Sequence, residues 1–348
     1  MSWGLLIGYG SIGKRHLLEM HKYVESVLVI DLNQETRSQL AKVPGHHEYL
    51  NSTSELLNNN MFVSMDFEIL VLANWAPDRR GVLYDLKNTA FKRILIEKPV
   101  ASSLADVDWI NDFVKSRHIP SAVNFHLRFS RLPDIINEIG REYSLGPIVK
   151  IVESGGAKCF SANGIHWLDL AMYLYQEKPA DVFSTHNFEK INPRSSSLNV
   201  VDGYALWTFS LNRKFEISYS NSSSFPSRLQ IYYKHALITL VNDELVVEIQ
   251  SDHLEDDLLA ITRTTEPMMT FTKKDVFGSE TGEDGISQLY KNLFEDRCHI
   301  DDFCHSTRAL LSSFAFDKIV KEQSIILKVF NPNVSTSKRE YEMDWRIT

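Results

Sequence analysis

The chain has 348 residues, and at about 150 residues per domain this length is typical of two domains. Its 43% hydrophobic and 24% charged residues exclude a disordered or collagen-like chain and indicate a globular protein. With 37 Lys plus Arg against 45 Asp plus Glu, the net charge of -8 disfavours a broad electrostatic hold on nucleic acid or an anionic membrane. We therefore expect neither kind of partner.

The chain has three cysteines, Cys159, Cys298 and Cys304, an odd number without the two-residue spacing of a zinc clasp. His299 and His305 follow two of them directly, but adjacent residues point apart, so we expect no metal site. The amino terminus lacks the layout of a signal peptide, and no stretch approaches the roughly 20 apolar residues that span a bilayer. These features predict a cytoplasmic protein without disulfides.

The first third of the chain alternates short apolar runs with amphipathic segments, which is typical of a parallel sheet with helices on both faces. We expect strands at residues 3–7, 27–30, 69–72, 93–96 and 122–125. We expect helices at residues 13–20, 34–42, 54–58, 77–88 and 104–117. The pattern predicts a doubly wound Rossmann domain over residues 1–123.

Beyond residue 123 the pattern changes to a second domain, which we expect over residues 124–348. Helices are predicted at residues 133–143, 164–175, 286–295 and 303–321. Strands joined by turn residues are predicted at 148–153, 204–210, 215–219, 229–233 and 237–241. The order of elements indicates an α+β domain with a large, mostly antiparallel open sheet.

A glycine-rich loop follows the first predicted strand and opens the first helix. Its glycines would supply a tight turn, a close backbone approach to a pyrophosphate and close packing of helix on strand. Free amide groups and the helix dipole favour the anion. The alternative is a turn that needs glycine only for its backbone geometry. The candidate cofactor-binding residues here are Gly8, Tyr9, Gly10, Ser11, Ile12 and Gly13.

Asp31 ends the second apolar run, about 20 residues after the loop, where a carboxylate can bind the adenosine ribose hydroxyls. A carboxylate repels a 2'-phosphate, and neither Leu32 nor Asn33 supplies a cation, so NAD is favoured over NADP. Arg37 lies close enough in sequence to leave NADP possible. The alternative for Asp31 is a solvated strand end.

The turn Glu97-Lys98-Pro99 follows the predicted strand at 93–96, at the sheet edge where ligands of open parallel sheets gather. A lysine there can donate a hydrogen bond to a substrate hydroxyl and assist an acid or base. By itself, a lysine after a strand is equally well a surface residue.

Four motifs in order resemble the glucose-fructose oxidoreductase, inositol dehydrogenase and MocA (Gfo/Idh/MocA) family. They are the loop at Gly8, the turn Glu97-Lys98-Pro99, the run Asn124 to Phe129, and Gly164 to Asp169. The resemblance covers essentially the whole chain. It implies an amino-terminal Rossmann domain, a second domain with an open, largely antiparallel sheet, and a homodimer or homotetramer built through that sheet.

The resemblance also implies roles for individual residues. Lys98 matches the lysine near the nicotinamide and the reacting hydroxyl, and His166 matches the acid/base histidine. Further cofactor contacts are implied for Asn74, Trp75 and Glu97, although the usual Thr-Pro pair is altered and Trp75 could equally be core. Substrate contacts are expected from His126, Arg128, Asn163 and Asp169.

The implied reaction oxidises a secondary alcohol: a base removes the hydroxyl proton while the cofactor takes the hydride. A nearby ammonium such as Lys98 favours the neutral imidazole that a base needs. Asp169 lies three residues after His166, on the same helix face, and can orient the ring or a substrate hydroxyl. Without the resemblance, His166 would be an ordinary helix-face histidine.

One position departs from the family pattern. Many family dehydrogenases carry an aspartate four residues before the histidine, where this chain has Ala162. We therefore hold two hypotheses: an NAD(P)-dependent oxidoreductase acting on a secondary hydroxyl or keto group of a sugar, cyclitol or nucleotide sugar, and a non-catalytic NAD-binding sensor or scaffold.

Overall fold

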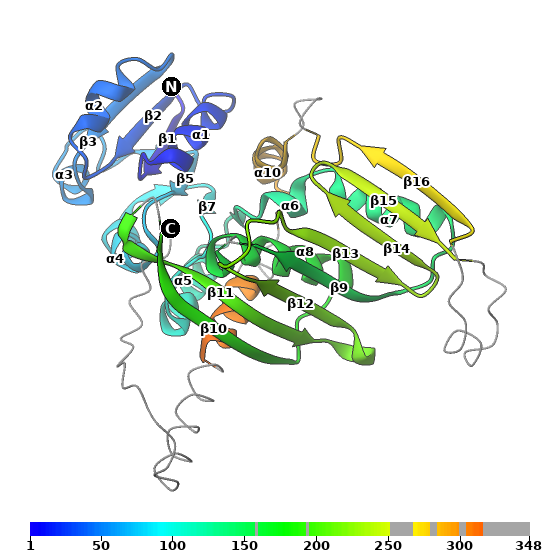
Figure 1. Cartoon of the computed structure of the whole chain (residues 1–348). Coiled ribbons are helices and arrows are strands. Elements are labelled where there is room, and N and C mark those ends of the chain that lie inside the picture. Colours follow the sequence, from blue (N-terminus) through cyan, green and yellow to red (C-terminus); the bar gives the residue numbers. More distant parts are fainter. Residues whose placement is uncertain (157–158, 193–194, 251–266, 279–283, 299–303, 316–348) are drawn as a thin grey trace, which may run out of the picture. The chain divides into compact units, whose positions relative to one another are not determined.

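The computed structural model describes residues 1–156, 159–192, 195–250, 267–278, 284–298 and 304–315 (Figure 1). Internal contacts divide the chain into two units, each described by itself below. The first unit comprises Met1–His126 and Ile286–Arg308, and the second comprises Leu127–Gly285 and resumes at Ala309.

The first unit is built on a six-stranded parallel sheet in the order β3-β2-β1-β5-β7-β8. Every residue of β1, β2, β5, β7 and β8 is buried, as expected for strands covered on both faces. The strands are β1 (Trp3–Ile7), β2 (Ser26–Ile30), β3 (His46–Leu50), β5 (Ile69–Leu72), β7 (Ile94–Ile96) and β8 (Ser121–Val123). A separate small sheet pairs β4 (Asp66–Phe67) with β6 (Ala90–Phe91).

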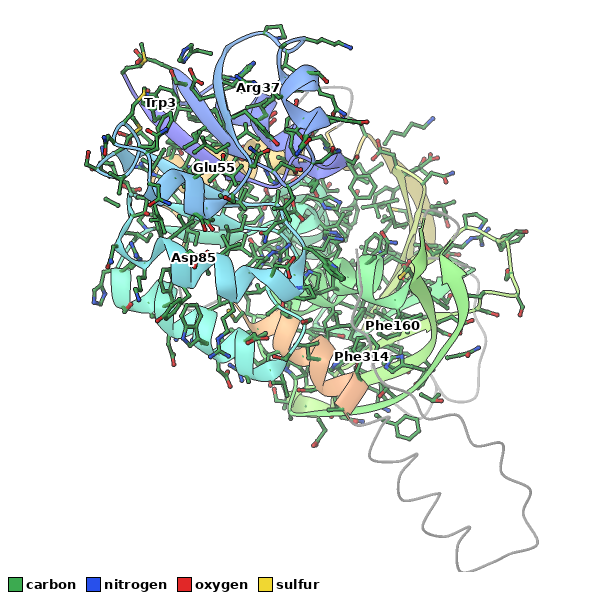
Figure 2. The ribbon with its side chains drawn as sticks, turned by 90° about the vertical axis from the view of Figure 1, so that its left-hand side faces the viewer. Trp3, Arg37, Glu55, Asp85, Phe160 and Phe314 are labelled. Carbon is green, nitrogen blue, oxygen red and sulfur yellow. The ribbon has the colours of Figure 1, made fainter. Side chains whose placement is uncertain are left out.

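Helices alternate with these strands, which confirms the predicted doubly wound fold. They are α1 (Ser11–Met20), α2 (Glu35–Leu40), α3 (Thr53–Leu57), α4 (Arg79–Asp85) and α5 (Leu104–Arg117). Glu55 and Asp85, labelled in Figure 2, mark α3 and the end of α4. The predicted helix at 77–88 is divided, because short 3-10 turns, Ala76–Asp78 and Leu86–Asn88, flank α4. The predicted strand at 122–125 ends at Val123.

The second unit holds an eight-stranded sheet in the order β10-β11-β12-β9-β13-β14-β15-β16. Six of its seven strand pairs are antiparallel, and β9 with β12 is the parallel one, so the predicted mostly antiparallel sheet is confirmed. The strands are β9 (Ile148–Gly155), β10 (Asp181–Asn192), β11 (Ser195–Thr208), β12 (Lys214–Tyr219), β13 (Arg228–Tyr233), β14 (Ala236–Val241), β15 (Glu244–Ile249) and β16 (Met269–Lys274).

Two helices, α7 (Leu132–Glu142) and α8 (Ile165–Tyr175), pack on this sheet (Figure 1). Tyr233 of β13 donates a hydrogen bond to the carbonyl of Ile136 in α7 at 3.2 Å. Tyr175 of α8 donates to the carbonyl of Lys214 in β12 at 2.7 Å. The alternating buried and half-exposed residues of β13, β14 and β15 fit a sheet with one face against the core.

Aromatic packing ties Phe314, in the last helical residues that the structure describes, to the rest of the second unit. Phe160 and Phe314, both labelled in Figure 2, have ring centroids 6.2 Å apart, and the ring of His186 lies within 4.6 Å of each. The remainder of the helix predicted at 303–321 lies outside the described residues. Over the described part of the chain, no helix combines the length and apolarity needed to cross a bilayer.

The helix α10 (Gly285–Phe294) corrects the predicted domain division, which placed all residues after 123 in the second domain. Contacts group its residues from Ile286 onward with the first unit, where Leu289, Tyr290 and Leu293 are completely buried. An amphipathic pattern shows that a helix has an apolar face but not which core receives it.

Leu289→Ala tests this placement. Removing a buried leucine side chain costs about 2–5 kcal/mol, so we expect faster hydrogen exchange in peptides from β1, α1 and β2, with the eight-stranded sheet unaffected. Leu18→Ala, at a position 57% exposed on α1, is the matched control and should change little. Faster exchange confined to the second unit would contradict the placement.

Candidate functional site

The three glycines of the loop after β1 differ in the space around them. Gly8 has φ +93°, and a Cβ there would lie 2.6 Å from the amide nitrogen of Asn74 in the loop after β5. A Cβ on Gly13 would collide with the carbonyl oxygen of Gly8. A Cβ on Gly10 would meet no heavy atom of the described residues within 4 Å. Thus Gly8 and Gly13 permit close packing, and Gly10 exposes backbone to open space.

The open backbone at Gly10 lies where α1 begins. Gly10 is the residue before the helix, and Ser11 is exposed in its first turn. The first amides of a ten-residue helix lack intrahelical partners and attract an anion, so the residues present fit the diphosphate of a dinucleotide. Tyr9 is buried and Ile12 is partly buried beside them.

Asp31 comes directly after β2 and binds the glycine loop. Its Oδ2 accepts a hydrogen bond from the Tyr9 amide at 2.5 Å, and its Oδ1 accepts one from the Asn33 amide at 2.7 Å. Each carboxylate oxygen has two lone pairs, so both retain capacity for ribose hydroxyls. Leu32 is 84% exposed, and Arg37 is exposed on α2 (Figure 2). The carboxylate therefore has a structural role at the place predicted for ribose binding.

A buried arginine that the sequence analysis missed joins the loops after β5 and β7. Arg79 donates to the carbonyl of Asn74 from Nε at 3.1 Å and from Nη2 at 2.7 Å. Its Nη1 donates to the carbonyls of Glu97 and Pro99, and to that of Val100 at 3.4 Å. Burial lowers the pKa of Arg79 to about 10, against the opposing influence of the Glu97 charge. The guanidinium thus remains protonated at neutral pH.

Glu97 directs its carboxylate into the interior of the first unit. The side chain is buried, and its Oε1 accepts hydrogen bonds from Asn124 Nδ2 at 2.5 Å and from His16 Nε2 at 2.8 Å. The other ring nitrogen of His16 lies 2.9 Å from the hydroxyl of Tyr290 in α10. The carboxylate therefore belongs to an internal hydrogen-bonded group that joins α1, α10 and the ends of β7 and β8, and the cofactor contact of Glu97 stays a prediction.

The ionisation of Glu97 is set by opposing influences. Burial raises its pKa, but the hydrogen bond and charge of His16, the hydrogen bond from Asn124 and the charge of Lys98 together lower it further. The net pKa lies below the ordinary value of 4.5, so Glu97 is a buried carboxylate at neutral pH. Its negative charge lies in the same interior as the guanidinium of Arg79.

The remaining first-unit candidates lie on the loops that Arg79 joins. Asn74 is partly buried after β5, and Trp75 is 38% exposed next to it. Lys98 is partly buried in the turn after β7, where the Lys98-Pro99 peptide is cis. The structure therefore brings Gly8, Asn74 and the backbone of the Lys98 turn together at the carboxyl edge of the parallel sheet.

In the second unit, Arg128 and Asp169 form a buried ion pair. Asp169 is completely buried, and its two oxygens accept from Arg128 Nε at 3.0 Å and Nη2 at 2.6 Å. This pair joins α6 (His126–Phe129) to α8. The Asp169 carboxylate binds Arg128, and the expectation that it orients the His166 ring or a substrate hydroxyl stays a prediction. Sequence spacing placed Asp169 on the helix correctly but could not show this partner, 41 residues away.

His166 lies in the first turn of α8 and is only 7% exposed. The helix is preceded by a π-helical turn, Phe160–Gly164, which carries the exposed Asn163 and the partly exposed Ala162. His126 is partly buried at the start of α6. Within the described part of the chain, no three His, Cys, Asp or Glu side chains are grouped to hold a metal ion.

Comparisons with known proteins agree with the motifs. Residues 4–125 match the family model GFO_IDH_MocA, described as "Oxidoreductase family, NAD-binding Rossmann fold". No curated protein matches the sequence.

Solved structures share the fold over nearly the whole chain. A dehydrogenase from Chromobacterium violaceum is 14% identical with a TM-score of 0.71, covering 95% of this chain and 99% of that one. The myo-inositol 2-dehydrogenase from Lactobacillus plantarum is 14% identical with a TM-score of 0.65, covering 91% and 97%. A super-repressor mutant of Gal80p from Saccharomyces cerevisiae is 12% identical with a TM-score of 0.65, covering 92% and 96%. At these identities the likeness establishes a common fold.

Paired glycine substitutions test the loop. Gly10→Ala adds a Cβ that meets no heavy atom of the described residues within 4 Å, so we expect an unchanged melting temperature. We expect at least tenfold weaker NAD binding by calorimetry, because the Cβ enters the space for the diphosphate. Gly8→Ala strains a positive φ and crowds Asn74, so both stability and binding should fall. Unchanged NAD affinity in a folded Gly10→Ala protein would contradict the diphosphate assignment.

Glu97→Gln tests the buried carboxylate. Because the folded pKa lies below the unfolded value of 4.5, ionised Glu97 stabilises the fold above that pH, and this contribution is lost as the pH falls through the lower, folded pKa. We expect Glu97→Gln to lower the free energy of unfolding by about 1–3 kcal/mol at pH 7, with a smaller difference from wild type near pH 4. Urea unfolding at both pH values measures this, and an equal difference at each would contradict it.

Proposed function

We propose that this chain, whose residues 4–125 belong to the Gfo/Idh/MocA family of NAD-binding oxidoreductases, moves a hydride between NAD(P) and a carbon that bears a secondary hydroxyl or keto group. The proposed substrate is a sugar, a cyclitol or a nucleotide sugar. The observation that carries the proposal is the open backbone at Gly10, at the start of α1 and tied through Tyr9 to Asp31.

In this proposal the first unit binds the cofactor. The amides at the start of α1 bind the diphosphate, and the carboxylate of Asp31 accepts from the ribose hydroxyls. The charge of Asp31 disfavours a 2'-phosphate, and its neighbours Leu32 and Asn33 offer no cation, so we propose NAD as the preferred cofactor. The bound nicotinamide supplies the hydride chemistry.

Lys98 and His166 are the proposed catalytic residues. The ammonium of Lys98 donates a hydrogen bond to the substrate oxygen and stabilises the negative charge that develops on it. The imidazole of His166 accepts the hydroxyl proton during oxidation and returns it during reduction. Ala162 offers no carboxylate, so the proposal assigns the proton transfer to His166.

Substrate recognition is assigned to the second unit and the start of α6. Arg128 is held rigidly by Asp169, and a fixed guanidinium can direct N–H groups at substrate hydroxyls. His126 and Asn163 are the other proposed substrate contacts. In this scheme Asp169 acts through Arg128 as a positioning residue.

We also propose a cellular compartment and an oligomeric state for the protein. A cytoplasmic setting is proposed because three cysteines are an odd number and none are spaced as a zinc clasp. A homodimer or homotetramer is proposed from the family resemblance, and light scattering measures it.

A second function is supported by two observations. Ala162 replaces the aspartate common in family dehydrogenases, and the Gal80p structure shows that a protein described as a super-repressor mutant shares this fold. A non-catalytic sensor or scaffold that binds NAD without turning it over is therefore the rival proposal.

Turnover assays separate the two functions. With a panel of sugars, cyclitols and nucleotide sugars, nicotinamide absorbance should change for wild type, and kcat should fall at least 100-fold in Lys98→Ala and in His166→Ala. Lys92→Ala is the control, since Lys92 is exposed and pairs with Glu68 at 2.6 Å. Full turnover in both variants would refute the catalytic assignment. Tight NAD binding without any accepted substrate would favour the sensor.

A further inference from the structure

One side chain connects the two loops that hold the proposed nicotinamide-side residues. Arg79 is the first residue of α4 and is only 3% exposed. On one side its Nε and Nη2 bind the carbonyl of Asn74, and on the other its Nη1 binds the carbonyls of Glu97 and Pro99, which flank Lys98. The guanidinium therefore holds the backbone on both sides of Lys98.

The contact continues to the glycine loop. The Asn74 residue whose carbonyl binds Arg79 presents its amide nitrogen to Gly8, at 2.6 Å from the place of a Gly8 Cβ. Gly8 in turn leads into the loop proposed to bind the diphosphate. The Arg79 guanidinium and the backbone of Asn74 thus connect the Lys98 turn to Gly8, all within the first unit.

An arginine can make this connection between two loops, and a lysine cannot make it in the same way. A guanidinium is a planar fork with five N–H donors, so it can bind carbonyls in two directions at once, whereas a lysine ammonium is a compact charge with rotating donors. Burying a charge is expensive, and apolar replacements of buried charges are often as stable or more stable. Stability by itself therefore gives little reason for an arginine here, and the fixed geometry of the two loops gives a specific one.

We propose that Arg79 is a positioning residue, which fixes Lys98 relative to the Asn74–Trp75 loop and so sets the place of the lysine ammonium against the bound dinucleotide. This inference rests on the proposed function for Lys98. Its local part, the joining of two loops, can be tested without any substrate.

Hydrogen exchange tests the local part in Arg79→Lys. The reporters are the amide of Asp78, which donates to the carbonyl of Trp75 at 3.1 Å, and that of Val100, which donates to Thr307 Oγ1 at 3.1 Å. We expect both to exchange at least fivefold faster in the variant, with β1 and β8 changing less than twofold. Exchange that is equally faster at the reporters and in β1 and β8, or unchanged at both reporters, would overturn the proposal.

Arg80→Lys is the matched control from the next position in the chain. Arg80 is half exposed, pairs with Asp106 at 3.0 Å and lies 5.5 Å from the centre of the Trp109 ring. The same substitution there should leave both reporter amides unchanged. If Arg79→Lys does not fold, Arg79→Gln replaces it, since it keeps a planar pair of N–H donors without the charge. Failure of both to fold would overturn a role confined to two loops.

A double-mutant cycle tests whether Arg79 acts through Lys98. We expect Arg79→Lys to lower kcat at least tenfold while the Kd for NAD changes less than threefold. In a Lys98→Ala background the same substitution should lower kcat by less than twofold, because the group that it positions is gone. Equal losses in both backgrounds, or unchanged kcat, would overturn the positioning role. Unchanged turnover in Lys98→Ala by itself would instead refute the catalytic role proposed for Lys98, on which this inference rests.

Discussion

The site in the first unit depends on where the backbone of Asn74 is held. On one side its amide meets Gly8, a position where any side chain would intrude, and on the other its carbonyl accepts two hydrogen bonds from Arg79. Carboxyl ends of parallel strands gather several loops at one edge, but such loops have few contacts that fix them. Here a missing side chain and a buried guanidinium fix the loops after β1, β5 and β7 against one another.

The same interior carries a second, oppositely charged group. Glu97 points its side chain toward His16 and Asn124 while its carbonyl accepts from Arg79. Tyr290 brings α10 into this group through His16, so a helix from late in the chain supports the turn that holds Lys98. Buried polar groups of this kind are costly unless satisfied, and their hydrogen bonds specify one arrangement of the surrounding elements.

Local sequence patterns predicted the parts of this architecture that depend on neighbours in sequence. The helix at 104–117 was predicted end to end; the Ser103 hydroxyl caps its first turn by accepting from the Asp106 amide, and His118 ends it in a left-handed conformation. The strand β3 was missed because its sequence, His-His-Glu-Tyr-Leu, is polar and lies half exposed at a sheet edge. The glycine loop could be found because its function depends on spacing within six residues.

The rest of the site could not be read from local patterns because its partners are distant in sequence. An arginine at the start of a helix is normally solvated. The sequence around Arg79 does not indicate that its carbonyl partners lie 18 and 20 residues away. Likewise, His16 and Tyr290 are separated by 274 residues. In the second unit, Asp169 binds Arg128, a partner 41 residues away that the sequence pattern did not indicate. These contacts join residues far apart in sequence, so only the folded structure shows them.

A crystal structure of the protein soaked with NAD tests the central claim most directly. The account predicts diphosphate oxygens within about 3.2 Å of the amides at Gly10 to Ile12, with a ribose hydroxyl on the Asp31 carboxylate. Density for NAD at any other place on the chain, or a loop that stays empty at saturating NAD, would contradict it.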